Sequence, residues 1–470
     1  MSLRRPVAVQ PLDTLGDVHF IAVGGAGMSG IAQLYAERGV RVSGSDRADS
    51  PVLAQLRAAG VTTFVGHDAA QLGQASTVVV SSAVPSTNPE LVAAQERGLL
   101  VWHRSTALAA LMLGKVAVSV AGTHGKTTTS AMTATMLAAA GADPSYVVGS
   151  PLQDSGRSAH LGQGPAFVVE ADESDGSFLQ YPTQIAVVTT VEADHLDSWG
   201  TAAAYAAGFA DFATAAGVEV LVADADDPGC RDLTGTVRQR GGRVRTVGES
   251  SDADIRLLDL RYPAGGARCR LQWEGQQAEL VLGVPGAFNL HNAATAFAVG
   301  LELGSDPAAL LRGAAQFRGT ERRFQPVAEV AGVTIVDDYA HHPTEITATL
   351  TAARALGAPR VVACFQPHLY SRTRDFAADF GQALASADLV LVTDVYPARE
   401  EPVPGVSGAL VAQAAEAAGA SVCYVERLDE VPSALARLVR PGDLVLTLGA
   451  GDITTVGPRL AAVLERPDAG

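Results

Sequence analysis

The residues VAVSVAGTHGKTT, at positions 116–128, combine two patterns in one short stretch. The first half consists mostly of small or β-branched apolar residues, which is typical of a strand buried in a parallel sheet. Glycines and hydroxyl side chains follow, and the chain then enters an alanine-rich segment with high helix propensity. A buried strand, a glycine loop and a helix in this order predict a phosphate-binding loop in an α/β domain.

This loop carries the groups that a nucleoside triphosphate needs. Backbone amides surround phosphate oxygens, Lys126 reaches the β and γ phosphates, and the Thr127 hydroxyl binds magnesium. Val120 stands where a strict phosphate loop has glycine, so the loop is a shortened form. Of the 34 basic residues only Lys115 and Lys126 are lysine, which makes a chance glycine–lysine turn a poor explanation. We predict that a nucleoside triphosphate binds through Gly122, Thr123, His124, Gly125, Lys126, Thr127 and Thr128.

A second glycine motif lies upstream, directly after the apolar run 18–23. It fits G-x-G-x-x-G and consists of Gly25, Ala26, Gly27, Met28, Ser29 and Gly30. Glycines at the start of a helix let backbone amides approach a diphosphate, and Asp46 follows the next apolar run, where an acid that binds ribose would lie. The motif predicts a nucleotide without saying which one, and a tight turn without a ligand is the alternative.

Downstream, apolar runs again alternate with helical segments, at 333–336, 360–365, 389–392 and 444–447. This alternation predicts parallel sheets covered by helices on both faces. Between positions 255 and 282 polar and apolar residues alternate instead, which predicts a small antiparallel addition. We therefore expect an α/β protein of three domains, at residues 1–107, 108–319 and 320–470.

Composition limits the possible partners. The chain has 470 residues, enough for two to four domains, and is 47% hydrophobic and 18% charged, as expected for a globular protein. Fifty acidic residues against 34 basic ones give a net charge of −16, which argues against nucleic acid and membrane surfaces as partners.

The four cysteines form no C-x-x-C pair, so neither a zinc site nor a disulfide framework is expected. We found no signal-peptide pattern and expect a cytoplasmic protein.

Two acidic segments follow apolar strands of the central region. Residues 170–175 (EADESD) follow the run 166–169, and crowded carboxylates at a strand end favour a bound cation such as magnesium. Residues 192–197 (EADHLD) follow the run 185–188 and place His195 among acids, which makes it a candidate metal ligand. A solvated acidic loop and a structural histidine are the alternatives.

Polar clusters also mark the C-terminal region. Arg322 and Arg323, at the expected second boundary, have the charge to close on phosphates or to form surface ion pairs. The segments 337–343 (DDYAHHP) and 366–372 (QPHLYSR) each follow a predicted strand, at the sheet edge where α/β proteins bind ligands.

Taken in order, these segments resemble the Mur ligase family. The resemblance extends from about Phe20 to about Gly451 and rests on eight motifs in register: GGAGMSG, GTHGKTTT, EADESD, EADHLD, PGAFNLHN, GTERRF, DDYAHHPTE and FQPHLYSRT. It implies a Rossmann-like N-terminal domain that binds UDP, a central P-loop ATPase, and a Rossmann-like C-terminal domain that binds the amino acid. The implied reaction is the ATP-dependent addition of L-alanine to the lactyl carboxylate of UDP-N-acetylmuramate through an acyl phosphate, an early step of peptidoglycan synthesis in cell-wall growth and division.

The resemblance also implies roles for individual residues. Thr127, Glu170 and His195 would hold magnesium, with two ions expected, and the ATP site would include Asn289 and Asn292 at the adenine, Arg323 at the phosphates and Asp338 at the ribose. Catalysis would involve Lys126, His195, Arg323, His341, His368 and Arg372. The substrates would contact Gly25, Ala26, Gly27, Met28, Ser29, His67, Ser81, Glu173, Tyr339, His341, Tyr370 and Arg372. The expected partners are small molecules only, in a monomer or homodimer.

Three single positions and one short segment depart from the family pattern. The segment is 396–401, which reads YPAREE where Tyr-Ala-Ala-Gly-Glu-Glu is commoner. Phe288 replaces the histidine that usually precedes the first asparagine of PGxHN, Thr190 replaces an asparagine before EADH, and Leu369 replaces an arginine after Gln-Pro-His. A carbamylated lysine, which several relatives use near the second metal, is impossible here because no lysine follows Lys126.

Other activities remain possible from the sequence. A recycling ligase that joins a preformed tripeptide to the same UDP-sugar is the nearest alternative, although Ser174 replaces the tyrosine of its usual EADEYD motif. An NAD-dependent oxidoreductase would explain only the first glycine motif. A nucleotide-binding switch without catalysis would not need the amino acid site.

Overall fold

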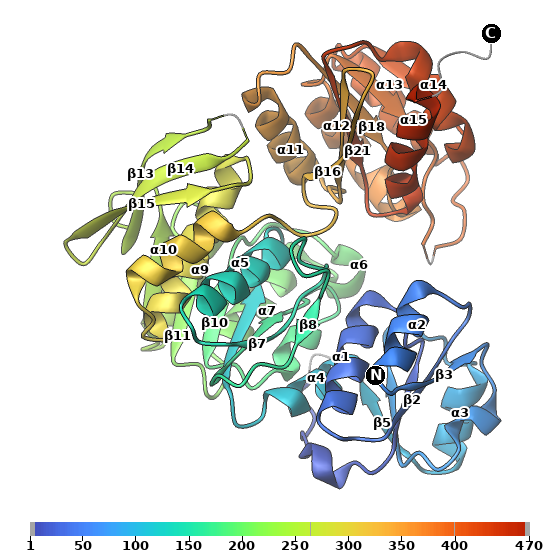
Figure 1. Ribbon diagram of the computed structural model, residues 1–470, viewed down its shortest axis with the longest axis vertical. Coiled ribbons are helices and arrows are strands. Elements are labelled where there is room, and N and C mark those ends of the chain that lie inside the picture. The colour runs from blue at the N-terminus through green and yellow to red at the C-terminus, as the bar shows by residue number, and fades with distance from the viewer. Residues whose placement is uncertain (1–4, 264, 399, 466–470) are drawn as a thin grey trace. The chain divides into compact units, whose positions relative to one another are not determined.

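The computed structural model describes residues 5–263, 265–398 and 400–465. It contains three separate sheets, of five, ten and six strands, and most of their strands run parallel with helices between them (Figure 1). The predicted three-domain α/β fold is therefore confirmed; the domain boundaries stay predictions. By its internal contacts the chain forms two compact units, and residues 1–259 and 318–470 make up most of them.

The five-stranded sheet has the order β3-β2-β1-β4-β5, and all neighbouring pairs are parallel. Its elements are β1 (Val18–Ile21), α1 (Ala26–Glu37), β2 (Val42–Asp46), α2 (Pro51–Ala58), β3 (Thr62–Val65), β4 (Thr77–Val80), α3 (Pro89–Glu96), β5 (Leu100–His103) and α4 (Arg104–Met112). Strand β1 ends two residues before its apolar run does, because Ala22 adopts a positive φ of 61° and its carbonyl accepts a turn hydrogen bond from Gly25.

The ten-stranded sheet has β6 (Val116–Ala121) between β10 (Ile185–Val188) and β9 (Ala166–Glu170), with parallel pairing on both sides. Its order is β15-β14-β13-β12-β11-β10-β6-β9-β7-β8. The remaining elements are α5 (Lys126–Ala139), β7 (Ser145–Val147), β8 (Ala159–His160), α6 (Leu196–Trp199), α7 (Ala202–Ala213), β11 (Val220–Asp224), α8 (Pro228–Gln239), β12 (Val244–Gly248), β13 (Ile255–Arg261), β14 (Ala267–Trp273), β15 (Gln276–Leu282), α9 (Ala287–Glu302) and α10 (Pro307–Gln316).

The antiparallel addition lies where alternation predicts it. Strands β14 and β15 are joined by Glu274 and Gly275, whose φ values of 46° and 76° fit the two-residue turn of a β-hairpin. The residues of β14 alternate between buried and solvent-facing positions, as a half-covered sheet requires.

The six-stranded sheet has the order β16-β17-β21-β18-β19-β20; only β16 is antiparallel to its neighbour. Its elements are β16 (Gln325–Val330), β17 (Val333–Asp338), α11 (Pro343–Ala355), β18 (Arg360–Phe365), α12 (Tyr370–Leu384), β19 (Leu389–Val392), α13 (Gly408–Ala417), β20 (Val422–Tyr424), α14 (Val431–Leu438), β21 (Asp443–Leu448) and α15 (Val456–Leu464). Apolar clusters cover both faces of this sheet. Among the described residues, no helix is both long and apolar enough to cross a membrane.

Candidate functional site

The phosphate loop joins β6 to α5 and depends on two of its glycines. Gly122 and Gly125 have φ values of 135° and 80°, in the left-handed region that other residues avoid. A Cβ on Gly122 would lie 2.1 Å from Thr189 Oγ1, and a Cβ on Gly125 would lie 2.7 Å from Asn292 Oδ1. The loop can therefore keep this form only with glycine at both positions.

The loop is fixed by the segment that follows β10. The backbone amide of His124 donates to Thr190 Oγ1 at 2.9 Å, and the amide of Thr123 donates to the Thr190 carbonyl at 2.9 Å. Thr190, which departs from the family pattern, thus holds the loop through both its side chain and its backbone.

Lys126 begins α5 and is bonded inside the loop. Its Nζ donates to the carbonyl of Gly122 at 2.7 Å and lies 3.0 Å from Glu173 Oε1. Burial raises the pKa of Glu173 to about 7, against the opposing charge of Lys126. The hydroxyl of Tyr205 also approaches Glu173 Oε1, at 3.4 Å, so the acidic loop and the phosphate loop share one buried carboxylate.

The proposed magnesium ligands come from different elements. Thr127 Oγ1 donates to Glu170 Oε1 at 3.0 Å, and the other oxygen of Glu170 accepts the amide of Gly149 at 2.7 Å. His195, which caps α6 with a φ of 51°, lies 3.8 Å from Glu173 and 3.6 Å from Asp194. The hydroxyl oxygen of Thr127 and the carboxylate oxygen of Glu170 are close enough to suit one magnesium ion. A direct contact between His195 and a metal ion stays a prediction.

The two asparagines predicted at the adenine both lie in the first turns of α9. Asn292 Oδ1 accepts the hydroxyl of Thr129 from α5, whereas Asn289 donates to the carbonyl of Pro285 at 2.6 Å. Phe288, the second departure from the family pattern, packs against the apolar core of the six-stranded sheet.

The first glycine motif lies at the carboxyl end of β1 and opens α1. Asp46, the last residue of β2, accepts the amide of Gly24 at 2.9 Å. The amides of Met28 and Ser29 donate to the carbonyl of Gly25, and the Met28 side chain is buried in the core. A diphosphate would therefore meet the amides that precede Met28 in the first turn.

His67 follows β3 at the same edge of the sheet. Its Nδ1 lies 2.8 Å from Glu90 Oε2 and 2.9 Å from Ser45 Oγ. Glu90 is fully buried and also contacts His19 at 3.2 Å. Burial raises the pKa of this carboxyl, but hydrogen bonds from His19, Ser45 and His67, together with the charge of His19, lower it by more, so the net shift is downward.

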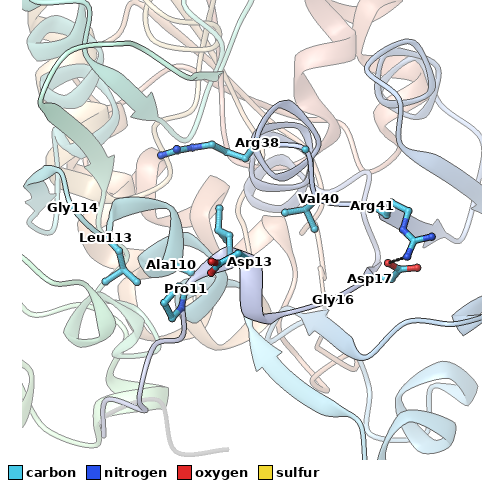
Figure 2. Close-up of a pocket in the computed structure, with 12 residues that line it drawn as sticks. Pro11, Asp13, Gly16, Asp17, Arg38, Val40, Arg41, Ala110, Leu113 and Gly114 are labelled. Carbon is cyan, nitrogen blue, oxygen red and sulfur yellow. Dashed lines mark ion pairs between the residues drawn. The ribbon is translucent and has the colours of Figure 1, made fainter.

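A pocket of about 690 Å³ opens at the other end of this sheet (Figure 2). Asp17 and Arg41, which directly precede β1 and β2, lie on its wall and form an ion pair at 2.8 Å. Because parallel sheets bind ligands at their carboxyl ends, this pocket is separate from the candidate site, and none of the predicted site residues is among its described lining residues.

In the C-terminal unit, Asp338 ends β17 and is buried. Its two oxygens accept the amides of Phe324 and Ala340, at 2.7 and 2.8 Å, and burial raises its pKa to about 6. Arg323 lies over the ring of Tyr339, 5.1 Å from its centroid, and 3.8 Å from Glu345.

An aromatic row continues along the carboxyl edge of this sheet. The rings of His341 and His368 are 5.9 Å apart, and His368 stacks on Tyr396 with an interplanar angle of 14°. Burial lowers the pKa of His341 to about 3, so its ring is neutral at pH 7. Arg372, in the first turn of α12 that Tyr370 opens, is buried nearby and contributes to lowering that pKa. Leu369, the third departure from the family pattern, has a φ of 68° directly before this helix.

The sequence alone indicates no role for four functional candidates: Arg104, Glu90, Glu345 and Tyr396. Tyr396 and Glu345 lie within the recognisable segments 396–401 and 337–345, where a nearby motif gave a signal. Arg104 and Glu90 lie in no motif, and only their contacts reveal them.

A phosphate loop on one sheet, a diphosphate turn on a second and a basic, histidine-rich edge on a third define a nucleotide-dependent enzyme of three α/β domains. Models of three parts of one family match the chain: the Mur ligase catalytic domain at residues 17–116, the middle domain at 120–300 and the glutamate ligase domain at 322–451. The chain belongs to the Mur ligase family.

Curated relatives match over almost the whole chain. The UDP-N-acetylmuramate–L-alanine ligase of Cutibacterium acnes is 58% identical over 99% of both chains, and that of Kineococcus radiotolerans is 55% identical over 97% of this chain and 98% of its own. Among solved structures, the UDP-N-acetylmuramate–alanine ligase of Thermotoga maritima is 28% identical, with a TM-score of 0.80 over 95% of this chain and 98% of that one.

Proposed function

We propose that the chain is an ATP-dependent ligase that joins L-alanine to the lactyl carboxylate of UDP-N-acetylmuramate and releases ADP and phosphate. The observation that carries this proposal is the pairing of the phosphate loop with the acidic loop, through Lys126 with Glu173 and Thr127 with Glu170. Relatives more than half identical over nearly their whole length are named for this reaction, which supports the choice of substrates.

The residues fit ATP with magnesium. The glycine loop leaves amides at the start of α5 for phosphate oxygens, and Thr127 and Glu170 would hold one magnesium ion. We propose a second ion near His195. Magnesium would supply positive charge between the lactyl carboxylate and the γ-phosphate, which otherwise repel each other.

The carboxylate is a poor electrophile until it is phosphorylated. Its oxygen attacks the γ-phosphorus, ADP leaves, and the resulting acyl phosphate is attacked by the alanine amine; phosphate then departs from the tetrahedral intermediate. For this sequence the chain must position the groups and offset negative charge, which Lys126 and Arg323 would do.

The amine must lose a proton to react. We propose His368 as its acceptor, because a ring with a pKa as low as that of His341 holds a proton too weakly at pH 7. His341, whose Nδ1 lies 3.0 Å from the Tyr339 carbonyl, would serve as a fixed neutral hydrogen-bond partner. Arg372 would bind the carboxylate of the amino acid.

The deciding experiment measures phosphate release with ATP, magnesium and UDP-N-acetylmuramate against a panel of amino acids and the tripeptide. We expect release with L-alanine and none with UDP-N-acetylglucosamine, which lacks the lactyl carboxylate. Release with the tripeptide but not with alanine would instead identify a recycling ligase. A cytoplasmic location and a monomeric or homodimeric state are further parts of this proposal.

A further inference from the structure

The acidic loop 170–175 bonds in two directions. Its glutamates contact the phosphate loop, as described above, whereas its aspartates contact the N-terminal domain. Asp172 Oδ2 accepts from Arg104 Nη2 at 2.7 Å, and Asp175 Oδ2 accepts from Ser82 Oγ at 2.7 Å. One hexapeptide therefore joins the phosphate loop to the N-terminal domain.

Arg104 opens α4 and lies against that glycine motif. A Cβ on Gly27 would be 3.4 Å from Arg104 Nη1, so the guanidinium borders the turn where a diphosphate would bind. Its side chain is 20% exposed, and Asp172 takes its Nη2. A guanidinium has five N–H donors in a planar fork that matches phosphate oxygens, so further donors are available for an anion.

Tyr181 gives a second, independent sign of a ligand. Its side chain is 5% exposed, and its hydroxyl is buried with no hydrogen-bond partner among the described residues. Arg104 and Asp172 are the charges that act most strongly on it. A buried hydroxyl without a partner costs free energy, which a phosphate or sugar oxygen would recover.

The two domains pack closely around this junction. A Cβ on Gly30 of α1 would lie 2.9 Å from the Cβ of Ala159 in β8. The backbone of Val7 is paired with the amide group of Gln180 through two hydrogen bonds, at 2.8 and 2.9 Å. These contacts hold the two domains closely together. A change in the hydrogen bonding of Arg104 should therefore displace Asp172 and the acidic loop, because close packing prevents small compensating shifts nearby.

We propose that Arg104 binds the diphosphate of the nucleotide-sugar and that Asp172 transmits this binding to the acidic loop that serves the ATP site. The proposal rests on the proposed function for the identity of the acceptor. A diphosphate that takes over donors of Arg104 leaves more negative charge on the acidic loop, which favours magnesium at Glu170. Acceptor and magnesium-bound nucleotide should therefore each strengthen the binding of the other, by the same factor.

Calorimetric titration of UDP, of a magnesium-bound non-hydrolysable ATP analogue, and of each in the presence of the other tests this directly. In the wild-type chain we expect UDP to strengthen analogue binding at least about fivefold. Arg104→Met should weaken UDP binding by about tenfold to a hundredfold, as loss of charge-assisted hydrogen bonds does. It should also abolish the coupling, and analogue binding alone should strengthen towards the wild-type value with UDP, because Asp172 loses the guanidinium that offsets its charge. Asp172→Asn should keep UDP binding within about threefold but lose the coupling.

Arg97→Met, at an exposed arginine whose side chain bonds only the Gly73 carbonyl among described groups, is the matched control and should behave as wild type. Arg104→Lys keeps the positive charge but lacks the planar guanidinium, and it should give a UDP affinity between those of wild type and Arg104→Met. Such partial rescue would show that Arg104→Met affects binding rather than folding. Tyr181→Phe should weaken UDP binding by a smaller factor.

Arg104→Met with wild-type UDP affinity would overturn the assignment; if only UDP-N-acetylmuramate binding then fell, Arg104 would serve the lactyl carboxylate instead. Coupling that survives in Asp172→Asn would overturn the transmission. A wild-type chain that binds no UDP at all would instead contradict the proposed function.

Discussion

Lys126 Nζ lies 3.0 Å from a carboxylate oxygen of Glu173 whose side chain is only 1% exposed. The ammonium group of the phosphate loop is thus paired with the acidic loop. A bound triphosphate would either share the ammonium group of Lys126 with Glu173 or take the place of Glu173 beside it.

Lys126→Ala should reduce phosphate release at least about a hundredfold, because it removes the only lysine of the loop and a charge-assisted contact to the transferring group. UDP-sugar affinity should stay within about threefold of wild type, since that site uses other residues. Lys115→Ala changes the chain's other lysine, which bonds the carbonyls of Gly162 and Gly164, and should retain phosphate release. Loss of UDP-sugar binding in Lys126→Ala would show that the sites are assigned to the wrong domains.

His195→Ala should raise the magnesium concentration needed for half-maximal phosphate release by about tenfold, which is the usual cost of losing one ligand or its support. The measurement is a magnesium titration at saturating ATP. His160→Ala, at a half-exposed histidine paired with Asp143, is the control. An unchanged titration curve would remove His195 from the metal site.

The motifs predicted the fold and the loop because their residue types carry the geometry. Gly122 and Gly125 are needed for backbone angles that other residues avoid, and the hydrophobic runs match the buried strands closely. Met28 shows the limit, since its position in the motif gave no sign that its side chain belongs to the core. Arg104 and Asp172 are 68 residues apart, and such a pairing depends on domain packing that no local pattern encodes.

The pH dependence of stability should reveal the neutral state of His341. Its folded pKa of about 3 is below the ordinary value of 6.5, so the unfolded chain binds more protons between these values. Stability from this group is complete above about pH 6.5 and falls as the pH decreases towards 3. Urea unfolding should therefore show wild type losing about 1–2 kcal/mol more than His341→Gln between pH 7.5 and 5. Parallel curves for the two chains would contradict a buried neutral ring.

Gly122→Ala should abolish nucleotide binding for two reasons. Alanine disfavours the φ of 135° at this position, and the added Cβ would lie 2.1 Å from Thr189 Oγ1. Gly141→Ala provides the comparison: its φ of 79° is also positive, but nothing lies within 4 Å of the new Cβ. It should cost about 1 kcal/mol of stability and leave affinity for the ATP analogue unchanged. Equal affinities in the two variants would mean that the loop can adopt another form.

Glu90→Ala should destabilise the first domain by about 3 kcal/mol or more, because it leaves buried His19 without its carboxylate partner. Glu96→Ala, at an exposed end of the same helix, should change stability by less than about 0.5 kcal/mol. Glu90→Gln removes the negative charge that holds His67, whose Nδ1 lies 2.8 Å from Glu90 Oε2. UDP affinity should therefore also fall in Glu90→Gln, under conditions in which this variant is folded. Urea midpoints test the first effect and titration with UDP the second; a Glu90→Gln chain that binds UDP normally would restrict this network to a structural role.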